Sequence, residues 1–358
     1  MTWRTPLLTW LLHALPAVDG QMQAWPGRSV LALWWRDMIR RRRLDWPGEV
    51  SGADDFEGGV VISRYRLMRG LLKRRAVREL AWNVIRLLKR RELIAFKAAL
   101  KSSSVKSFVR EGEVAIDQVV SDLRACGAVV GPALPADQVE YLTQFAERMP
   151  CYADRVPSQG FYLRDRALAE QKLGKELLLA QYFNILDDQR IDALSKDPFL
   201  LGLAAEYLGA PPKLLGANMW WTFPVQASAQ DKAKHAHVFH YDLDDVKFVK
   251  FFFYLTDVDE ASGPHVYVKG SNCQIKYKNT LLKSKRFTDD EVIQAYGEEN
   301  IIHVHGEAGA CLIEDTITLH KGVTPTQRAR LLLQFEYSIN TYPEASCVVD
   351  AAECKIFV

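Results

Sequence analysis

The stretch Lys234-His-Ala-His-Val-Phe-His-Tyr-Asp-Leu-Asp-Asp245 gathers imidazoles and carboxylates in one short segment. In an extended segment, residues i and i+2 point to the same face, so His240 and Asp242 project an imidazole and a carboxylate into a shared space. A third ligand must come from elsewhere, and the candidate is His320, about 80 residues further along. Two imidazoles and one carboxylate on one triangular face leave the opposite positions of an octahedral ion free. This arrangement suits iron(II) that binds an oxidant and O2 together.

A His-x-Asp pair alone does not identify a metal site, because a strand histidine bonded to a nearby aspartate is often structural. The order of the surrounding motifs is more specific. Downstream stand the apolar run 248–255, the turn Ser262-Gly-Pro264, the segment Val268-Lys-Gly-Ser271, the carboxylates Glu314-Asp315 ahead of His320-Lys-Gly322, and Arg328-Ala-Arg330-Leu-Leu-Leu-Gln-Phe335.

In this order, the motifs resemble the phytanoyl-CoA dioxygenase family of iron(II)- and 2-oxoglutarate-dependent oxygenases over roughly residues 111–340. The resemblance implies a double-stranded β-helix, a jelly roll of two facing sheets with the metal at its mouth. It also implies that His240, Asp242 and His320 are the catalytic residues and metal ligands. The cofactors and co-substrates implied are Fe(II), 2-oxoglutarate and O2.

The resemblance further implies an arginine, about ten residues beyond the last metal ligand, that binds the distal carboxylate of 2-oxoglutarate. A planar guanidinium offers two parallel donors to a carboxylate. Both Arg328 and Arg330 fit this description. We predict Arg330 from its spacing to His320, with Arg328 as the alternative, while an ion pair with Glu336 or with a surface acid would be the structural explanation for either.

The composition changes along the chain and predicts three parts. Residues 1–110 form a basic helical N-terminal region, residues 111–345 the oxygenase domain and residues 346–358 a C-terminal tail. Helices are expected at 117–126, from 135, at 168–179 and at 197–208, and strands at 128–130, 215–223, 246–255, 265–268, 301–305, 310–312 and 330–338. The predicted fold class is mainly β with α, in which helices pack around a cupin-like core.

The N-terminal region carries the charge asymmetry of the chain. Residues 1–110 contain 22 Lys or Arg and 9 Asp or Glu, whereas the remainder contains 24 and 35. Between residues 62 and 100, leucines recur at helical spacing among basic clusters such as Lys73-Arg-Arg75. One explanation is a solvated cationic face on packed helices. The other is a surface for an anionic partner: a membrane headgroup, an acidic carrier protein or, less favoured, nucleic acid.

The remaining histidines of the second half have alternative explanations. His235 and His237 lack a carboxylate two residues on, and we expect them in a loop near the mouth of the site. His303 and His305 share a strand face, which would suit zinc, but we interpret them as ordinary sheet residues. His265 follows the Ser-Gly-Pro turn and is a candidate for the pocket wall.

The cysteines and the chain start bear on the compartment. The six cysteines form no C-x-x-C pair, which argues against a zinc ribbon or a dense disulfide framework and favours a reducing compartment. The start weakly resembles a signal peptide, but Trp10, His13 and Pro16 interrupt its apolar run. We expect a cytoplasmic protein, with peripheral contact to the inner face of the membrane if the basic region binds there.

The predicted function is that of a 2-oxoglutarate-dependent dioxygenase that hydroxylates its substrate. Desaturation and epimerisation stay open because they use the same ligands. The fold does not select the substrate, but the cationic front favours a membrane-presented molecule such as a lipid-linked sugar of the lipopolysaccharide inner-core type. A small natural product or an acyl thioester is the alternative. The rival from another class is a non-catalytic, membrane-associated binding protein on the same fold.

Overall fold

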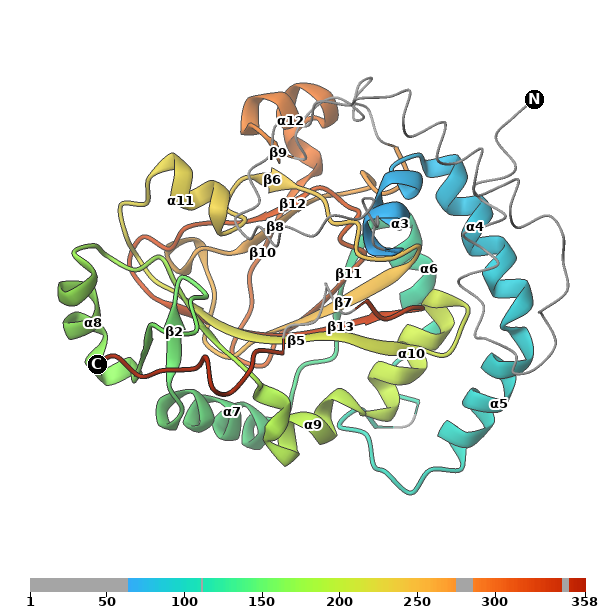
Figure 1. Cartoon of the computed structure of the whole chain (residues 1–358). Coiled ribbons are helices and arrows are strands. Elements are labelled where there is room, and N and C mark those ends of the chain that lie inside the picture. The colour runs from blue at the N-terminus through green and yellow to red at the C-terminus, as the bar shows by residue number, and fades with distance from the viewer. Residues whose placement is uncertain (1–63, 111, 275–285, 343–347) are drawn as a thin grey trace, which may run out of the picture. The chain divides into compact units, whose positions relative to one another are not determined.

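The computed structural model describes residues 64–110, 112–274, 286–342 and 348–358 (Figure 1). Residues Arg64–Val358 form one compact unit. The first part of the predicted basic region, including the arginine run 40–43, lies outside the described residues. The domain boundaries at residues 110 and 345 stay predictions.

Two antiparallel sheets form the core and confirm the predicted double-stranded β-helix (Figure 1). The larger sheet has eight strands, in the order β1 (Ala128–Gly131), β11 (Cys311–Glu314), β7 (Phe248–Tyr254), β13 (Arg330–Ser338), β5 (Lys213–Thr222), β4 (Leu179–Tyr182), β2 (Cys151–Ala153) and β3 (Gly160–Phe161). The smaller sheet has five, in the order β10 (Ile301–Val304), β8 (His265–Val268), β12 (His320–Gly322), β6 (Phe239–His240) and β9 (Arg286–Phe287).

The middle of the larger sheet supplies much of the hydrophobic core. Every residue of β7 and β13 is buried, and Phe253 lies opposite Leu333 as Phe251 lies opposite Phe335. A strand covered on both faces is apolar throughout rather than alternating. Helix α10 (Pro198–Leu208) packs against both strands, so the sequence of β7, Phe-Val-Lys-Phe-Phe-Phe-Tyr, is apolar apart from one lysine.

Helix α10 begins and ends at the residues that the sequence indicates. The Asp197 side chain accepts a hydrogen bond from the amide of Phe199, and Pro198 occupies the first turn. Gly209 ends the helix in the left-handed conformation, with φ 68°. The other helices beside the sheets are α6 (Ile116–Cys126), α7 (Ala136–Arg148), α8 (Arg166–Leu173), α9 (Gln189–Ser195), α11 (Ala229–Lys234) and α12 (Asp289–Tyr296).

The helix predicted at residues 168–179 was wrong in its second half. Helix α8 ends at Leu173, and Gly174 follows it in the left-handed conformation. The next apolar run, Leu177 to Leu179, is buried and leads into strand β4 beside β5. A short apolar run bounded by a glycine fits a buried strand as well as a helix, and periodicity cannot separate the two.

The described part of the chain begins with helices α3 (Arg64–Leu72), α4 (Arg75–Leu88) and α5 (Arg90–Lys101), ahead of α6 and the first strand. The indole nitrogen of Trp82 in α4 donates a hydrogen bond to the carbonyl of Leu208 at 2.6 Å. Helix α5 also contacts α10, so these helices pack on the outside of the larger sheet's helical layer (Figure 1). None of the helices that the structure describes is long and apolar enough to cross a membrane.

Candidate metal centre

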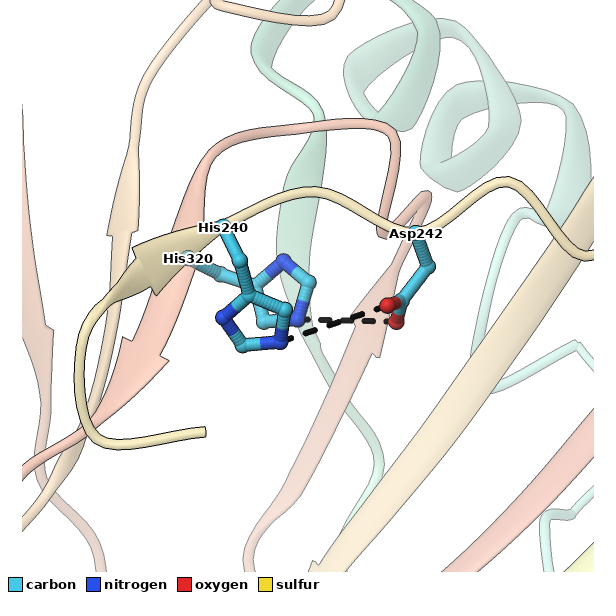
Figure 2. Close-up of side chains that lie close together, drawn as sticks. All are labelled: His240, Asp242 and His320. Carbon is cyan, nitrogen blue, oxygen red and sulfur yellow. Dashed lines mark ion pairs between the residues drawn. The ribbon is translucent and has the colours of Figure 1, made fainter. Parts of the chain in front are cut away.

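Strands β6 and β12 pair in the smaller sheet and place His240 directly opposite His320. The centroids of their rings are 4.3 Å apart. Figure 2 shows both rings turned toward the carboxylate of Asp242. The Nε2 atom of His240 lies 4.0 Å from Oδ1 of Asp242, and Nε2 of His320 lies 3.6 Å from Oδ2. The structure therefore brings the three predicted residues together.

Asp242 reaches this position in a way that the sequence did not indicate. Strand β6 ends at His240, so strand alternation does not place the carboxylate. Instead, the backbone amide of Asp242 donates a hydrogen bond to the carbonyl of Thr316 at 2.7 Å. This bond ties the segment after β6 to the loop before β12, and thereby holds Asp242 beside His320.

Main-chain carbonyls hold both imidazoles in one tautomer. The Nδ1 atom of His240 lies 2.9 Å from the carbonyl oxygen of Val238, and Nδ1 of His320 lies 2.9 Å from that of Thr318. Because a carbonyl can only accept, each Nδ1 carries the proton and donates it. Each Nε2 therefore keeps its lone pair facing Asp242, which is the form in which an imidazole binds a metal.

The protonation states of the three side chains also suit a cation. Burial lowers the pKa of His320 to about 4 and lowers that of His240 as well. Burial alone would raise the pKa of Asp242, but the positive charge of Lys250 holds it well below its usual range. At neutral pH the donors are two neutral imidazoles and one carboxylate, with ligand atoms within 4.8 Å of one another. This donor set fits iron(II).

Lys250 is the lysine that interrupts the apolar strand β7, and it lies among three carboxylates. Its Nζ is 2.9 Å from Oδ2 of Asp242, 3.2 Å from Asp244 and 3.4 Å from Glu336. Burial lowers the pKa of Lys250, yet these carboxylates, Asp242 first, raise it well above its ordinary value. Lys250 was not among the site residues predicted from the sequence. The sequence does contain a signal, which is the lysine inside the apolar run of β7, because lysine is seldom buried without a partner.

His265 of β8 forms a second buried layer behind His320. Its ring stacks on that of His320, with centroids 5.5 Å apart and planes 13° from parallel. Its Nε2 lies 2.7 Å from Oε2 of Glu314. Burial lowers the pKa of His265 to about 3 and raises the pKa of Glu314 to about 8. A neutral imidazole and a protonated carboxylic acid thus line the interior next to His240, Asp242 and His320, which we call the triad.

The two candidate arginines occupy different environments. Arg330 opens β13, is 3% exposed, and donates a hydrogen bond to the carbonyl of Gly263. Among the described residues its Nε finds no hydrogen-bond partner, so a buried donor remains available for a carboxylate. Its charge also contributes to the lowered pKa of His265, after burial. The arginine therefore lies near the triad.

Arg328 lies before β13, which begins at Arg330, so the two arginines do not share a face of the strand. Its side chain is 57% exposed and forms an ion pair with Asp259. Asp259 is itself 54% exposed, so Arg328 has the surface acid that was one of its two expected structural partners. The other, Glu336, pairs with Lys250. Arg330 is the better placed of the two for a buried carboxylate ligand.

The other histidines lie outside the triad. Nε2 of His235 is 3.1 Å from the carboxylate of Asp154, and Nδ1 of His237 is 2.8 Å from the hydroxyl of Thr324. Burial lowers the pKa of His237 to about 3. These two histidines therefore have partners apart from the candidate metal ligands.

A family model described as phytanoyl-CoA dioxygenase (PhyH) matches residues 125–330. The chain belongs to the phytanoyl-CoA dioxygenase family. Enzymes of this family use Fe(II), 2-oxoglutarate and O2, and the chain is a 2-oxoglutarate-dependent non-haem iron dioxygenase. The matched range contains the whole triad and ends at Arg330. The resemblance drawn from the sequence motifs is confirmed.

Several solved structures are similar to this member of the phytanoyl-CoA dioxygenase family. The α-ketoglutarate-dependent epimerase SnoN from nogalamycin biosynthesis is 18% identical with a TM-score of 0.44, over 62% of this chain and 82% of that one. HygX from Streptomyces hygroscopicus, with nickel and 2-oxoglutarate bound, is 16% identical with a TM-score of 0.44, over 62% and 86%. EctD from S. alaskensis, with bound Fe, is 15% identical with a TM-score of 0.41, over 65% and 79%. No curated protein matches the chain.

Proposed function

We propose that this oxygenase binds Fe(II) through His240, Asp242 and His320, binds the distal carboxylate of 2-oxoglutarate with Arg330, and hydroxylates its substrate. The observation that carries the proposal is the convergence of two carbonyl-oriented imidazoles on one ionised carboxylate (Figure 2). When bound, Fe(II), 2-oxoglutarate and O2 supply the oxidation, in which the co-substrate becomes succinate and CO2 and one oxygen atom enters the substrate.

The chain's own groups orient and charge the site. The carbonyls of Val238 and Thr318 hold the two imidazoles in the metal-binding tautomer. Lys250 keeps Asp242 ionised and hydrogen-bonds its Oδ2 atom. The buried guanidinium of Arg330 supplies a donor to a carboxylate in surroundings where a charge-assisted hydrogen bond is strong.

Replacement of the triad tests the assignment. His240→Ala, Asp242→Ala and His320→Ala should each abolish Fe(II) binding in anaerobic equilibrium dialysis and release of succinate from 2-oxoglutarate. Asp122→Asn, at an exposed carboxylate on α6, is the control and should change neither. If a triple variant loaded with iron still decarboxylates 2-oxoglutarate, other residues hold the metal.

We further propose that the substrate is presented at an anionic membrane surface, as a lipid-linked sugar is. Residues 64–110 contain 15 Lys or Arg and only 2 Asp or Glu. Exposed apolar and basic side chains alternate on the outer sides of α4 and α5. We define the α4–α5 surface as Arg75, Leu80, Leu87, Leu88, Arg90, Arg91 and Ile94, all of which are exposed.

Leu87 and Ile94 illustrate why this surface favours a membrane. They are 71% and 60% exposed, although helix surfaces in solution are usually charged or polar at such positions. Apolar side chains that enter the headgroup region beside cations that attract anionic lipids are typical of peripheral membrane helices. Charge complementarity therefore favours an anionic lipid surface as the partner.

Helix α3 connects these helices with the metal centre. The Tyr65 hydroxyl donates a hydrogen bond to Oδ1 of Asp244 at 3.2 Å, and Asp244 shares Lys250 with Asp242. The ring of Tyr65 also lies 5.3 Å from that of Tyr342. The loop that carries Asp242 therefore contacts helix α3 of the basic region directly. This contact supports a substrate that reaches the metal centre from the membrane to which the basic helices would bind.

Vesicle binding tests this part of the proposal. Each cation near an anionic membrane contributes about 1 kcal/mol, so Arg90→Gln with Arg91→Gln should weaken sedimentation with phosphatidylglycerol vesicles roughly 30-fold. Leu87→Ser with Ile94→Ser should weaken vesicle binding as well, and added salt should weaken vesicle binding of the wild type. Succinate release without substrate should stay unchanged.

The control combines Lys269→Gln with Val130→Ser, which removes an exposed cation and an exposed apolar side chain elsewhere. It should leave vesicle binding intact. If the wild type binds no vesicles, or if binding survives both sets of substitutions and high salt, the α4–α5 surface is a solvated or protein-covered face. A small soluble substrate is then favoured.

A further inference from the structure

A second group of metal-ligating side chains lies outside the triad. Glu260 begins the short helix η3 (Glu260–Ser262), His303 lies in β10, and His305 follows that strand. Nδ1 of His303 and Nε2 of His305 lie 2.8 and 2.9 Å from the same carboxylate oxygen, Oε1 of Glu260. In the described part of the chain, this group and the triad are the two that could supply three or more metal ligands.

Main-chain pairing holds the three side chains together. Val258 and Gly306 form an isolated antiparallel bridge, with N–H to O distances of 2.8 and 3.0 Å in its two directions. The bridge fixes the segment before Glu260 next to the residue after His305. Because residues i and i+2 of an extended segment share a face, His303 and His305 both present their rings to Glu260. The main chain therefore positions all three donors.

We propose that Glu260, His303 and His305 form a second metal site, which binds a divalent ion of the zinc type. Two imidazole nitrogens and one carboxylate oxygen are donors that zinc prefers, whereas Mg²⁺ and Ca²⁺ prefer sites made of oxygen ligands alone. The three ligand atoms lie within 4.8 Å of one another and all three residues are exposed. Solvent can therefore deliver the ion, and water can complete its coordination.

The position of this surface site gives it a structural consequence. Gly263 directly follows η3, and its carbonyl accepts a hydrogen bond from Arg330. An ion held between Glu260 and the two histidines would tie η3 to β10. It would thereby stabilise the turn whose carbonyl Arg330 contacts, so zinc should raise the melting temperature through this site as well as through the triad.

Zinc stoichiometry tests the inference. In equilibrium dialysis of the full chain, the wild type should bind two Zn²⁺ ions. The variant His303→Asn with His305→Asn should bind one, and His240→Ala with His320→Ala should also bind one. Glu260→Gln should weaken the surface site by more than the roughly 10- to 100-fold typical of a lost neighbour of a ligand. Glu307→Gln, at an exposed acid nearby, is the matched control and should have no effect.

The two sites fail in different ways. If the variant with His303→Asn and His305→Asn still binds two ions, the surface site is overturned. It is also overturned if the wild type binds a single ion that is lost only when His240 and His320 are replaced. A wild type whose single ion is lost only with His303 and His305 supports the surface site and contradicts the proposed triad. Circular dichroism of each metal-free variant verifies that it is folded.

Discussion

At the scale of single residues, Arg330 and Arg328 can be compared directly. Arg330 is buried and its Nε has no hydrogen-bond partner among the described residues, whereas Arg328 is exposed and paired with Asp259. We predict that Arg330→Lys weakens 2-oxoglutarate binding about 10- to 150-fold. Lysine keeps the charge but loses the planar pair of donors, and a charged hydrogen bond contributes about 1.5–3 kcal/mol. Calorimetric titration of the Ni²⁺-loaded protein measures the affinity. Arg328→Lys should bind nearly as the wild type does, and the reverse ranking would assign the role to Arg328.

Lys250 is predicted to compensate the charge of Asp242 until a metal does so. Lys250→Met leaves Asp242, Asp244 and Glu336 without their shared cation, and such a loss costs about 3–5 kcal/mol of unfolding free energy. A metal ion at the triad should restore part of the lost unfolding free energy, because its charge compensates that of Asp242. Urea unfolding with and without Ni²⁺ measures the recovery.

Lys247→Met is the comparison for Lys250, because Lys247 pairs with the buried Asp315 at 2.9 Å. It should lose stability without the additional recovery on Ni²⁺ binding. Equal recovery in both variants would show that Lys250 acts only as a structural ion pair.

The residues of the site differed in how far the sequence could reveal them. The order of the motifs identified His240, Asp242 and His320 together, so their proximity was predictable, although the hydrogen bond from Asp242 to Thr316 that places the carboxylate was not. The sequence did not decide between Arg328 and Arg330, because that choice depends on where β13 begins and which arginine Asp259 contacts. The partners of Lys250 come from two places, the segment after β6 that carries Asp242 and Asp244 and strand β13 that carries Glu336, and only the fold brings them together.

At the scale of elements, Gly127 joins helix α6 to the loop before His320. Gly127 ends α6 with φ 89°, and a Cβ there would lie 2.2 Å from the hydroxyl oxygen of Thr318. The carbonyl of Thr318 accepts the hydrogen bond from His320. We predict that Gly127→Ala lowers both the melting temperature and the Ni²⁺ affinity, because Thr318 must move.

Gly174→Ala separates this effect from ordinary strain. Gly174 also ends a helix in the left-handed conformation, with φ 67°, but a Cβ there meets no atom within 4 Å. It should lose only the roughly 1–2 kcal/mol of left-handed strain and keep its Ni²⁺ affinity. If Gly127→Ala also keeps its affinity, Thr318 yields without disturbing His320.

Elements with strong local signals were predictable, and those formed by long-range pairing were not. Helix α10 lies between Asp197 and Gly209, and both boundaries are visible in the sequence. Strands β6 and β12 span two and three residues, which is too short for any alternating pattern to show. They exist because they pair with each other, while β12 also pairs with β8 and β6 with β9. The pairing of β6 with β12 creates the metal centre.

At the scale of the whole molecule, the hydrophobic core is independent of the metal. Phe251, Phe253, Leu333 and Phe335 are fully buried in the larger sheet, whereas the triad belongs to the smaller sheet and its loop. We predict that chelation leaves the far-ultraviolet circular dichroism unchanged. Adding Ni²⁺ at about 100 times its dissociation constant should stabilise the wild type by about 2.7 kcal/mol. His320→Ala should lose the part of that gain that comes from the triad, and a chelated wild type that unfolds would show that the metal is structural.

The pairing of His240 with His320 also determines when iron can enter during the life of the protein. About 80 residues separate the two strands, and closing such a loop has an entropic cost that local helices do not carry, so we expect this contact to form after them. A chain still on the ribosome with His240 and Asp242 already synthesised lacks the third ligand. We therefore expect the folded protein to bind the metal, in competition with the other divalent metals that the cell supplies. Because the buried core does not depend on the triad, we expect protein made without iron to be folded and to gain activity when iron is added later.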